Sequence, residues 1–254
     1  MIIKIILLLT LNLNLIYCAT WFGNFSSFSS WNIRHSNLAE MRDIVNDPKG
    51  GPDKVLRVKY SAGSYWTSPS KGGTQFYIYP LENIVTGHVS FEFEVLFPSN
   101  FDFVKGGKLP GLFGGRPGCS GGDSALDCFS GRFMWGPSSS GYCYLYIPKN
   151  VAHLPEFCQL TGFPKCDQQY GFGLAGRANY FPKDKWNKIK ETIKLNTPGQ
   201  ANGRLTISVN GNQIFDYDKI IFRTTNSISI NGIMFETCKY IFFIIYCFSF
   251  LFLN

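Results

Sequence analysis

Apolar and polar residues alternate with a period of two along much of this chain. In segment 89–98 the phenylalanines and a valine share one face and two glutamates take the other. Such alternation is typical of strands with one buried face. The Asn210-Gly211 pair favours a tight hairpin turn between two of the strands. Five strands are predicted in this way: 55–60, 74–80, 89–98, 188–196 and 203–217.

Helical periodicity is nearly absent, and LAEMRDIVND (38–47) is the one modest helix candidate. Many short strands separated by Gly, Pro and Asn turns are typical of an all-β sandwich or jelly roll. We therefore expect a β-jelly roll of two antiparallel sheets, with one face curved into a substrate groove.

Two further strand-like segments, CFSGRFMWG and GYCYLYIP, are joined by the turn GPSSSG. Ser130 and Arg132 lie two residues apart, so they share a sheet face, as do Tyr144 and Tyr146. The short turn predicts that the two strands pair antiparallel. One wall would then present a serine, a guanidinium and two phenols, with Lys108 reaching in from a glycine-rich loop. The alternative interpretation is a polar outer face with aromatic filler.

The 17% aromatic content suits strands and sugar-facing surfaces. The net charge of +7 is compatible with several acidic partners. No Lys/Arg-rich block or basic helix occurs, so we expect no nucleic-acid partner. The three histidines are scattered, and neither metal-ligand spacing nor a nucleotide-binding context is present, so we expect no metal and no cofactor.

Residues 1–19 combine an early lysine, an apolar stretch and small residues, which indicates a secretory signal peptide and an extracellular protein. The sequon at Asn24 is compatible with glycosylation. In an oxidising compartment the close cysteine pairs favour disulfide-closed loops, and the sequence leaves their pairing open. The residues concerned are Cys119, Cys128, Cys158 and Cys166. Cys143 is expected to be a buried free thiol.

The blocks GGKLPGLFGG, CSGG…CFSGRFMW, YLYIP, W-N-x-I-K…KLNTPG-x-x-NG and NGIMFET occur in this order. Together they resemble the polysaccharide lyase family 14 domain over residues 20–237. The resemblance implies a β-jelly roll and an alginate- or glucuronan-type lyase. Where related sequences often carry glutamate and arginine, this chain has Tyr142 and Gly136. The residues that the resemblance implies as catalytic are Lys108, Ser130, Arg132, Tyr144 and Tyr146.

These residue types suit β-elimination of a 4-linked polyuronate without a metal ion. Lys108 and Arg132 would bind and polarise the uronate carboxylate. Either tyrosine could act as base or acid, and Ser130 would supply a positioning hydrogen bond. Lys105 and Trp135 are expected to bind substrate. The glycines beside Lys108 are interpreted as clearance for a polymer chain. Leu109-Pro110 and Leu112-Phe113 are interpreted as the anchor that aims Lys108 into the groove.

The resemblance ends at Thr237, and residues 238–254 form a divergent hydrophobic tail. It is interpreted as a gene-model artefact or a truncated last strand, which would leave a sheet edge unpaired. We expect a monomer with an acidic polysaccharide as its partner, and no membrane contact unless the tail is real. Two other functions stay open: a non-catalytic carbohydrate-binding jelly roll and a tail-anchored surface protein.

Overall fold

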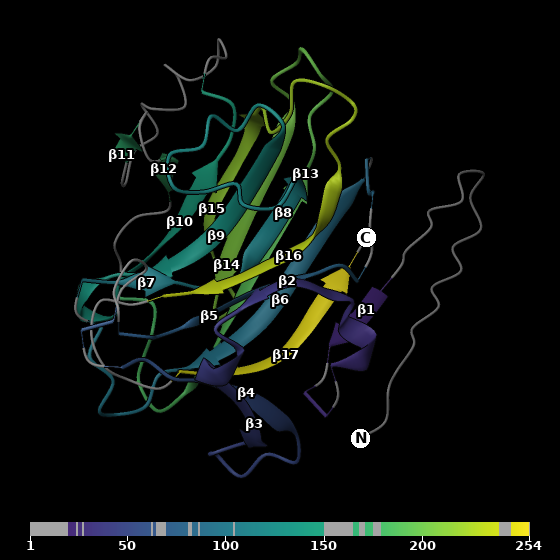
Figure 1. Ribbon diagram of the computed structural model, residues 1–254. Coiled ribbons are helices and arrows are strands. Elements are labelled where there is room, and N and C mark those ends of the chain that lie inside the picture. The colour runs from purple at the N-terminus through teal and green to yellow at the C-terminus, as the bar shows by residue number, and fades with distance from the viewer. Residues whose placement is uncertain are drawn as a thin grey trace, which may run out of the picture.

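Two antiparallel β-sheets stack face to face in the computed structural model of the chain (Figure 1). The structure describes residues 20–253 except 24, 27, 62, 65–69, 81–82, 86, 104, 150–164, 168–170, 175–178 and 239–244. The signal-peptide prediction for residues 1–19 and the glycosylation prediction at Asn24 lie outside the described residues. Three short 3-10 turns interrupt the strands: η1 (Ser29–Trp31), η2 (Ala39–Met41) and η3 (Pro137–Ser139).

The eight-stranded sheet forms the back of the molecule relative to the predicted site. Its strand order is β15 (Asn212–Ile220), β14 (Gly203–Val209), β13 (Trp186–Lys194), β6 (His88–Leu96), β17 (Ile245–Leu253), β4 (Lys54–Val58) and β3 (Arg42–Asn46). The eighth strand, β1 (Thr20–Gly23), pairs with β17. All five strands predicted from alternation are confirmed, and Asn210-Gly211 forms the turn between β14 and β15.

The nine-stranded sheet carries the predicted site. Its strand order is β11 (Lys165–Asp167), β12 (Gly171–Leu174), β10 (Gly141–Tyr146), β9 (Cys128–Trp135), β8 (Gly111–Gly115), β16 (Ile230–Thr237), β5 (Thr74–Ile78) and β2 (Ile33–Asn37). The ninth strand, the two-residue β7 (Gly107–Lys108), pairs with β9. Strands far apart in sequence therefore lie side by side, as β16 does between β8 and β5.

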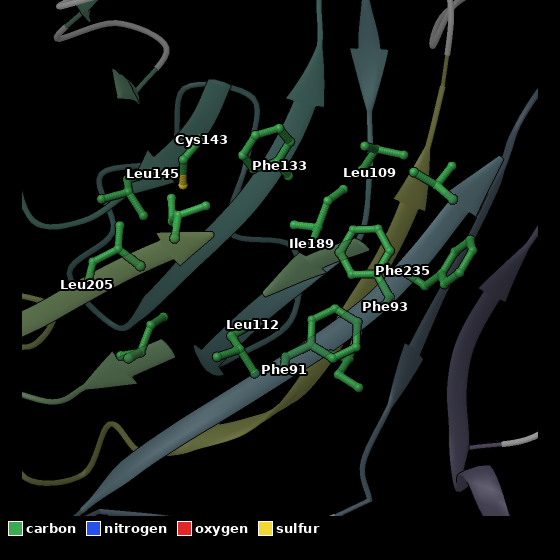
Figure 2. Packing of buried hydrophobic residues seen from close by; sticks show 14 of the residues in the cluster. Phe91, Phe93, Leu109, Leu112, Phe133, Cys143, Leu145, Ile189, Leu205 and Phe235 are labelled. Carbon is green, nitrogen blue, oxygen red and sulfur yellow. The ribbon is translucent and has the colours of Figure 1, made fainter. Parts of the chain in front are cut away.

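The hydrophobic core fills the space between the sheets (Figure 2). Phe91 and Phe93 of β6 face this space from the back sheet, and Phe235 of β16 and Leu112 of β8 face it from the other. All four side chains are buried. Because side chains alternate along a strand, the neighbours of these residues point away from the core. The side of the nine-stranded sheet that faces away from the core is called the outer face below.

The helix predicted for residues 38–47 is wrong. Residues 39–41 make only the single turn η2, and residues 42–46 form strand β3. Ile44 and Val45 pair with Leu56 and Val55 of β4. Branched side chains fit such a pairing better than they fit a helix.

The hydrophobic tail contributes strand β17, which lies beside β6 (Figure 1). Its backbone pairs with β6 on one side and with β4 and β1 on the other. The expectation of an unpaired sheet edge at this place is therefore wrong. Among the described residues, no helix has the length and apolar character needed to cross a membrane.

A carboxyl group lies buried in the core directly behind the predicted site. Glu191 of β13 accepts a hydrogen bond from the Leu112 backbone N–H (2.9 Å). Its other oxygen leaves no room for a side chain at position 131, where a Cβ would lie 2.2 Å away. Burial raises the pKa of Glu191 to about 8, although the hydrogen bond from Leu112 lowers it. The folded protein therefore holds this carboxyl protonated at neutral pH.

We expect the free energy of unfolding of wild type to fall as pH rises toward the pKa of Glu191. Glu191→Gln should abolish this fall. The folded-state pKa lies above the unfolded value, so the folded state binds more protons between about pH 4.5 and 8. Wild type should lose on the order of 5 kcal/mol relative to Glu191→Gln across this window, with no further change above it. Urea unfolding at several pH values measures the difference. Parallel stability curves for the two proteins would contradict this prediction.

Candidate active site

Strands β9 and β10 bring four of the predicted residues together. They pair antiparallel, as the short turn between them predicted, and the register sets Arg132 opposite Tyr144 and Ser130 opposite Tyr146. The intervening residues, Cys143 and Leu145 among them, point into the core (Figure 2). The four predicted side chains therefore project from the outer face. The rings of Tyr144 and Tyr146 meet edge to face, with centroids 5.5 Å apart.

Lys108 reaches the same face from β7, where it pairs with Met134 of β9. The preceding glycines do not provide clearance for a polymer, so that interpretation is wrong. A Cβ at position 107 would lie 2.0 Å from the Trp135 indole, so glycine lets β7 pack directly on β9. Of the predicted anchor, Leu109 and Leu112 are buried in the core between the sheets. Phe113 is buried elsewhere, in a small cluster with Tyr77, Tyr79 and Met234.

Glu236 of β16 joins the two cations of the site. One carboxylate oxygen accepts a hydrogen bond from Lys108 Nζ, and the other accepts one from Arg132. The side chains of Glu236 and Arg132 are each only 1% exposed, whereas that of Lys108 is 21% exposed. Burial raises the pKa of Glu236, but the charges of Arg132 and Lys108 outweigh burial and leave it below its ordinary value. Glu236 is therefore ionised, and Lys108 is the cation that solvent can reach.

The sequence prediction missed Glu236, although the signal was present. The residue lies in the NGIMFET block, which served only as part of the resemblance. Ile233 and Phe235 of β16 are core residues, so alternation places Met234 and Glu236 on the outer face. An acidic residue there, on a strand that has no other charged residue, indicates a partner cation.

The hydroxyl of Tyr146 is held by a loop above the outer face. It accepts a hydrogen bond from the backbone N–H of Gly121 (3.0 Å). Burial raises the pKa of Tyr146, and the charge of Arg132, hydrogen bonds from Gly121 and Gly122, and one with Tyr144 lower it, so that the net shift is upward. The Tyr146 side chain is almost fully buried, whereas Tyr144 is half-buried. Tyr144 is therefore the phenol that a bound sugar can contact.

Ser130 is fully buried, and its hydroxyl donates a hydrogen bond to the Cys119 carbonyl (2.8 Å). Cys119 and Cys128 form a disulfide, which confirms one of the predicted cysteine pairs. Cys158 lies outside the described residues and the Cys166 side chain is not described, so that disulfide stays a prediction. Cys143 is a buried free thiol, as expected.

Trp135 does not bind substrate, which corrects the prediction. Its side chain is fully buried, and the indole packs edge to face against Tyr60 and Phe97 in the core. Lys105 is exposed in the turn before β7, and its role stays a prediction. A cavity of about 580 Å³ lies elsewhere, between residues 99–103, η3 and residues 181–183. None of the predicted site residues lines it.

The two antiparallel sheets form a jelly roll similar to the folds of alginate lyases. The family model of polysaccharide lyase 14 matches residues 48–243, so the chain belongs to that family. The family resemblance and the all-β fold class predicted from the sequence are thereby confirmed.

Solved structures agree with this assignment. A marine PL-14 alginate lyase from Aplysia kurodai superposes with a TM-score of 0.74 at 28% identity, covering 92% of this chain and 98% of that one. An alginate lyase from Chlorella virus gives a TM-score of 0.73 at 24% identity, covering 88% of this chain and 92% of that one, which shows the shared fold.

A curated relative is much longer than this chain. Exolysin of Paramecium bursaria Chlorella virus 1 is 30% identical over 197 residues, which are 67% of this chain and 29% of exolysin. The chain thus spans under a third of the length of this relative.

Glu236→Gln should destabilise the protein strongly, because it leaves the buried Arg132 beside Lys108 without a counter-charge. Removing one partner of a buried ion pair costs about 3–5 kcal/mol. Urea unfolding at pH 7 measures the loss. Since the pKa of Glu236 is depressed in the folded state, the advantage of wild type should shrink as pH falls through that pKa.

The matched control is Glu92→Gln, which breaks an ion pair with Lys188 on the partly exposed surface of the back sheet (3.1 Å). Such surface pairs contribute at most about 1 kcal/mol. Equal losses in the two variants would show that Glu236 does not balance the cations of the site.

Proposed function

We propose that this protein is a lyase that cleaves a 4-linked polyuronate by β-elimination without a metal ion. The observation that carries the proposal is the Lys108–Glu236–Arg132 cluster beside a tyrosine pair on one sheet face. Membership of the polysaccharide lyase 14 family supports it. So does the marine alginate lyase that shares more than a quarter of the aligned residues.

The charges of the cluster suit a single uronate carboxylate. Two cations and one carboxylate leave a net charge of +1, which one further carboxylate neutralises. Lys108 is the partly exposed cation, so it contacts the sugar, while the buried Arg132 orients Glu236. A neutralised carboxylate makes the C5 proton more acidic and stabilises the enolate-like charge that develops during its removal.

The tyrosines transfer the protons. A base removes the C5 proton, the C5–H electron pair forms the C4–C5 double bond, and the C4–O4 bond breaks. O4 then takes up a proton as it leaves. Tyr144 meets the sugar because it is the more exposed phenol. The Tyr146 hydroxyl accepts the Gly121 N–H, and its hydrogen bond with Tyr144 lowers the pKa of Tyr146 and holds the two phenols together. Tyr144, the phenol that meets the sugar, is assigned as the base.

We also propose that the protein is secreted. The N-terminal sequence supports this, and so does the Cys119–Cys128 disulfide, since disulfides persist mainly in oxidising compartments.

The recombinant protein should cleave at least one acidic polysaccharide among glucuronan, alginate and pectate. Each cut creates a 4,5-unsaturated uronate, so ultraviolet absorbance should rise with time. A neutral β-1,4-glucan is the control and should give no signal, because it has no carboxylate to neutralise. Binding of a polyuronate without any rise in absorbance would contradict the proposed lyase activity. It would favour a non-catalytic carbohydrate-binding module.

Lys108→Ala and Tyr144→Phe should each lower kcat by at least about 100-fold, since each removes a group that touches the reacting sugar. Lys105→Ala is the matched comparison, because it removes an exposed lysine that is predicted to bind substrate but not to take part in the reaction, so its effect should fall on KM. Its kcat should stay within about threefold of wild type. Initial rates from the absorbance assay give the values. A Tyr144→Phe variant with near-normal turnover would show that the assigned base is wrong.

A further inference from the structure

The backbone of one loop binds hydroxyl groups from three strands of the nine-stranded sheet. This segment, residues 118–128, is called the 118–128 loop. The Gly118 N–H donates to the hydroxyl of Tyr77 on β5 (2.8 Å). The Gly121 N–H donates to Tyr146 on β10 (3.0 Å). The third hydroxyl, that of Ser130 on β9, donates to the carbonyl of Cys119 in the loop (2.8 Å).

The loop is fixed at both ends. The Cys119–Cys128 disulfide closes it. Just before it, Arg116 forms ion pairs with Asp123 and Asp127 in the loop. These contacts restrict the backbone, so the N–H groups and the carbonyl that face the sheet keep their directions.

Glycine is required where the loop turns its N–H groups toward the sheet. Gly118 and Gly121 have φ angles of +86° and +67°, in the left-handed region that other residues adopt only with strain. The disulfide packs against the tyrosine pair as well. Both of its half-cystines form a small apolar cluster with the Tyr146 ring, and Tyr144 lies against this cluster.

Ser130 is buried, whereas Lys108 and Tyr144 are partly exposed, so Ser130 has a different role from these two residues. Its side chain has no exposed surface, and its only hydroxyl proton is donated to the loop. A sugar on the outer face therefore cannot contact this hydroxyl without displacing the loop. Tyr146 is only 4% exposed and is held by the same loop.

We propose that the 118–128 loop is a positioning element of the active site, and that Ser130 is a positioning residue that acts through this loop rather than a group that touches substrate. The proposal rests on the proposed lyase function. The loop fixes the Tyr146 hydroxyl, which in turn orients Tyr144. The Cys119–Cys128 disulfide and the Ser130 hydroxyl both serve this one purpose.

A double-mutant cycle tests whether Ser130 and the disulfide act through the same loop. The disulfide is removed by Cys119→Ala/Cys128→Ala, because alanine leaves no polar group in these buried positions. Ser130→Ala and the disulfide-free protein should each lower kcat on the order of tenfold, the effect of one or two lost hydrogen bonds, with less than about a threefold change in KM. In the disulfide-free background, Ser130→Ala should lower kcat further by less than about twofold.

Ser90→Ala is the control. It also removes one hydroxyl hydrogen bond, to Thr192 (2.7 Å), but on the back sheet and far from the loop. Its effect should be the same with and without the disulfide. If Ser130→Ala lowers kcat by an equal factor in both backgrounds, Ser130 acts independently of the loop and the proposal is overturned.

Amide hydrogen exchange tests the loop without any need for activity. Tyr146→Phe should speed exchange at Gly121, and Tyr77→Phe should speed exchange at Gly118, because each amide loses its acceptor. Unchanged exchange at both glycines would overturn the positioning role of the loop. If wild type cleaves no polyuronate, the lyase function fails, and the exchange experiment still decides whether the loop is held by these hydroxyls.

Discussion

The carboxylate of Glu236 is the contact on which the outer face depends. It holds Lys108 and Arg132, which lie 128 and 104 residues away in the sequence. Two cations this close repel each other in a medium of low dielectric constant, and an isolated buried guanidinium would be strongly destabilising. The carboxylate reduces the repulsion between the two cations and offsets the cost of burying the guanidinium. It also links β7, β9 and β16 through side-chain contacts. Everything proposed for the substrate carboxylate follows from the charge that remains after this pairing.

Local pattern was enough to predict the strands and part of the site. The apolar residues of β6 recur at every second position, so its strand conformation and its buried face follow from the sequence. The GPSSSG turn is short, and this predicts the antiparallel pairing of β9 and β10 that the structure has. The pairing of β16 with β8 and β5 leaves no such local sign, because its partners are more than a hundred residues away. Alternation along β16 is enough to place Glu236 on the outer face, but not to tell which cations it meets there.

Other errors came from applying the pattern too loosely. Trp135 is three residues from Arg132 on the same strand, so strict alternation places it on the core face, where it lies. The predicted helix at 38–47 had apolar residues at helical spacing, but the branched pair Ile44-Val45 finds strand partners on β4. Tertiary pairing overrode a weak local preference in that segment.

Strand β17 has a consequence for how quickly the fold forms. It pairs with β1, β4 and β6, from which it is separated by roughly 150 to 230 residues of chain. Pairings of such high sequence separation require the ends of long loops to meet before any contact stabilises them, and this makes folding slow. Until β17 docks, β4 and β6 both present open edges in the middle of the back sheet. The folding intermediate that lacks β17 is therefore the species most exposed to association with other chains.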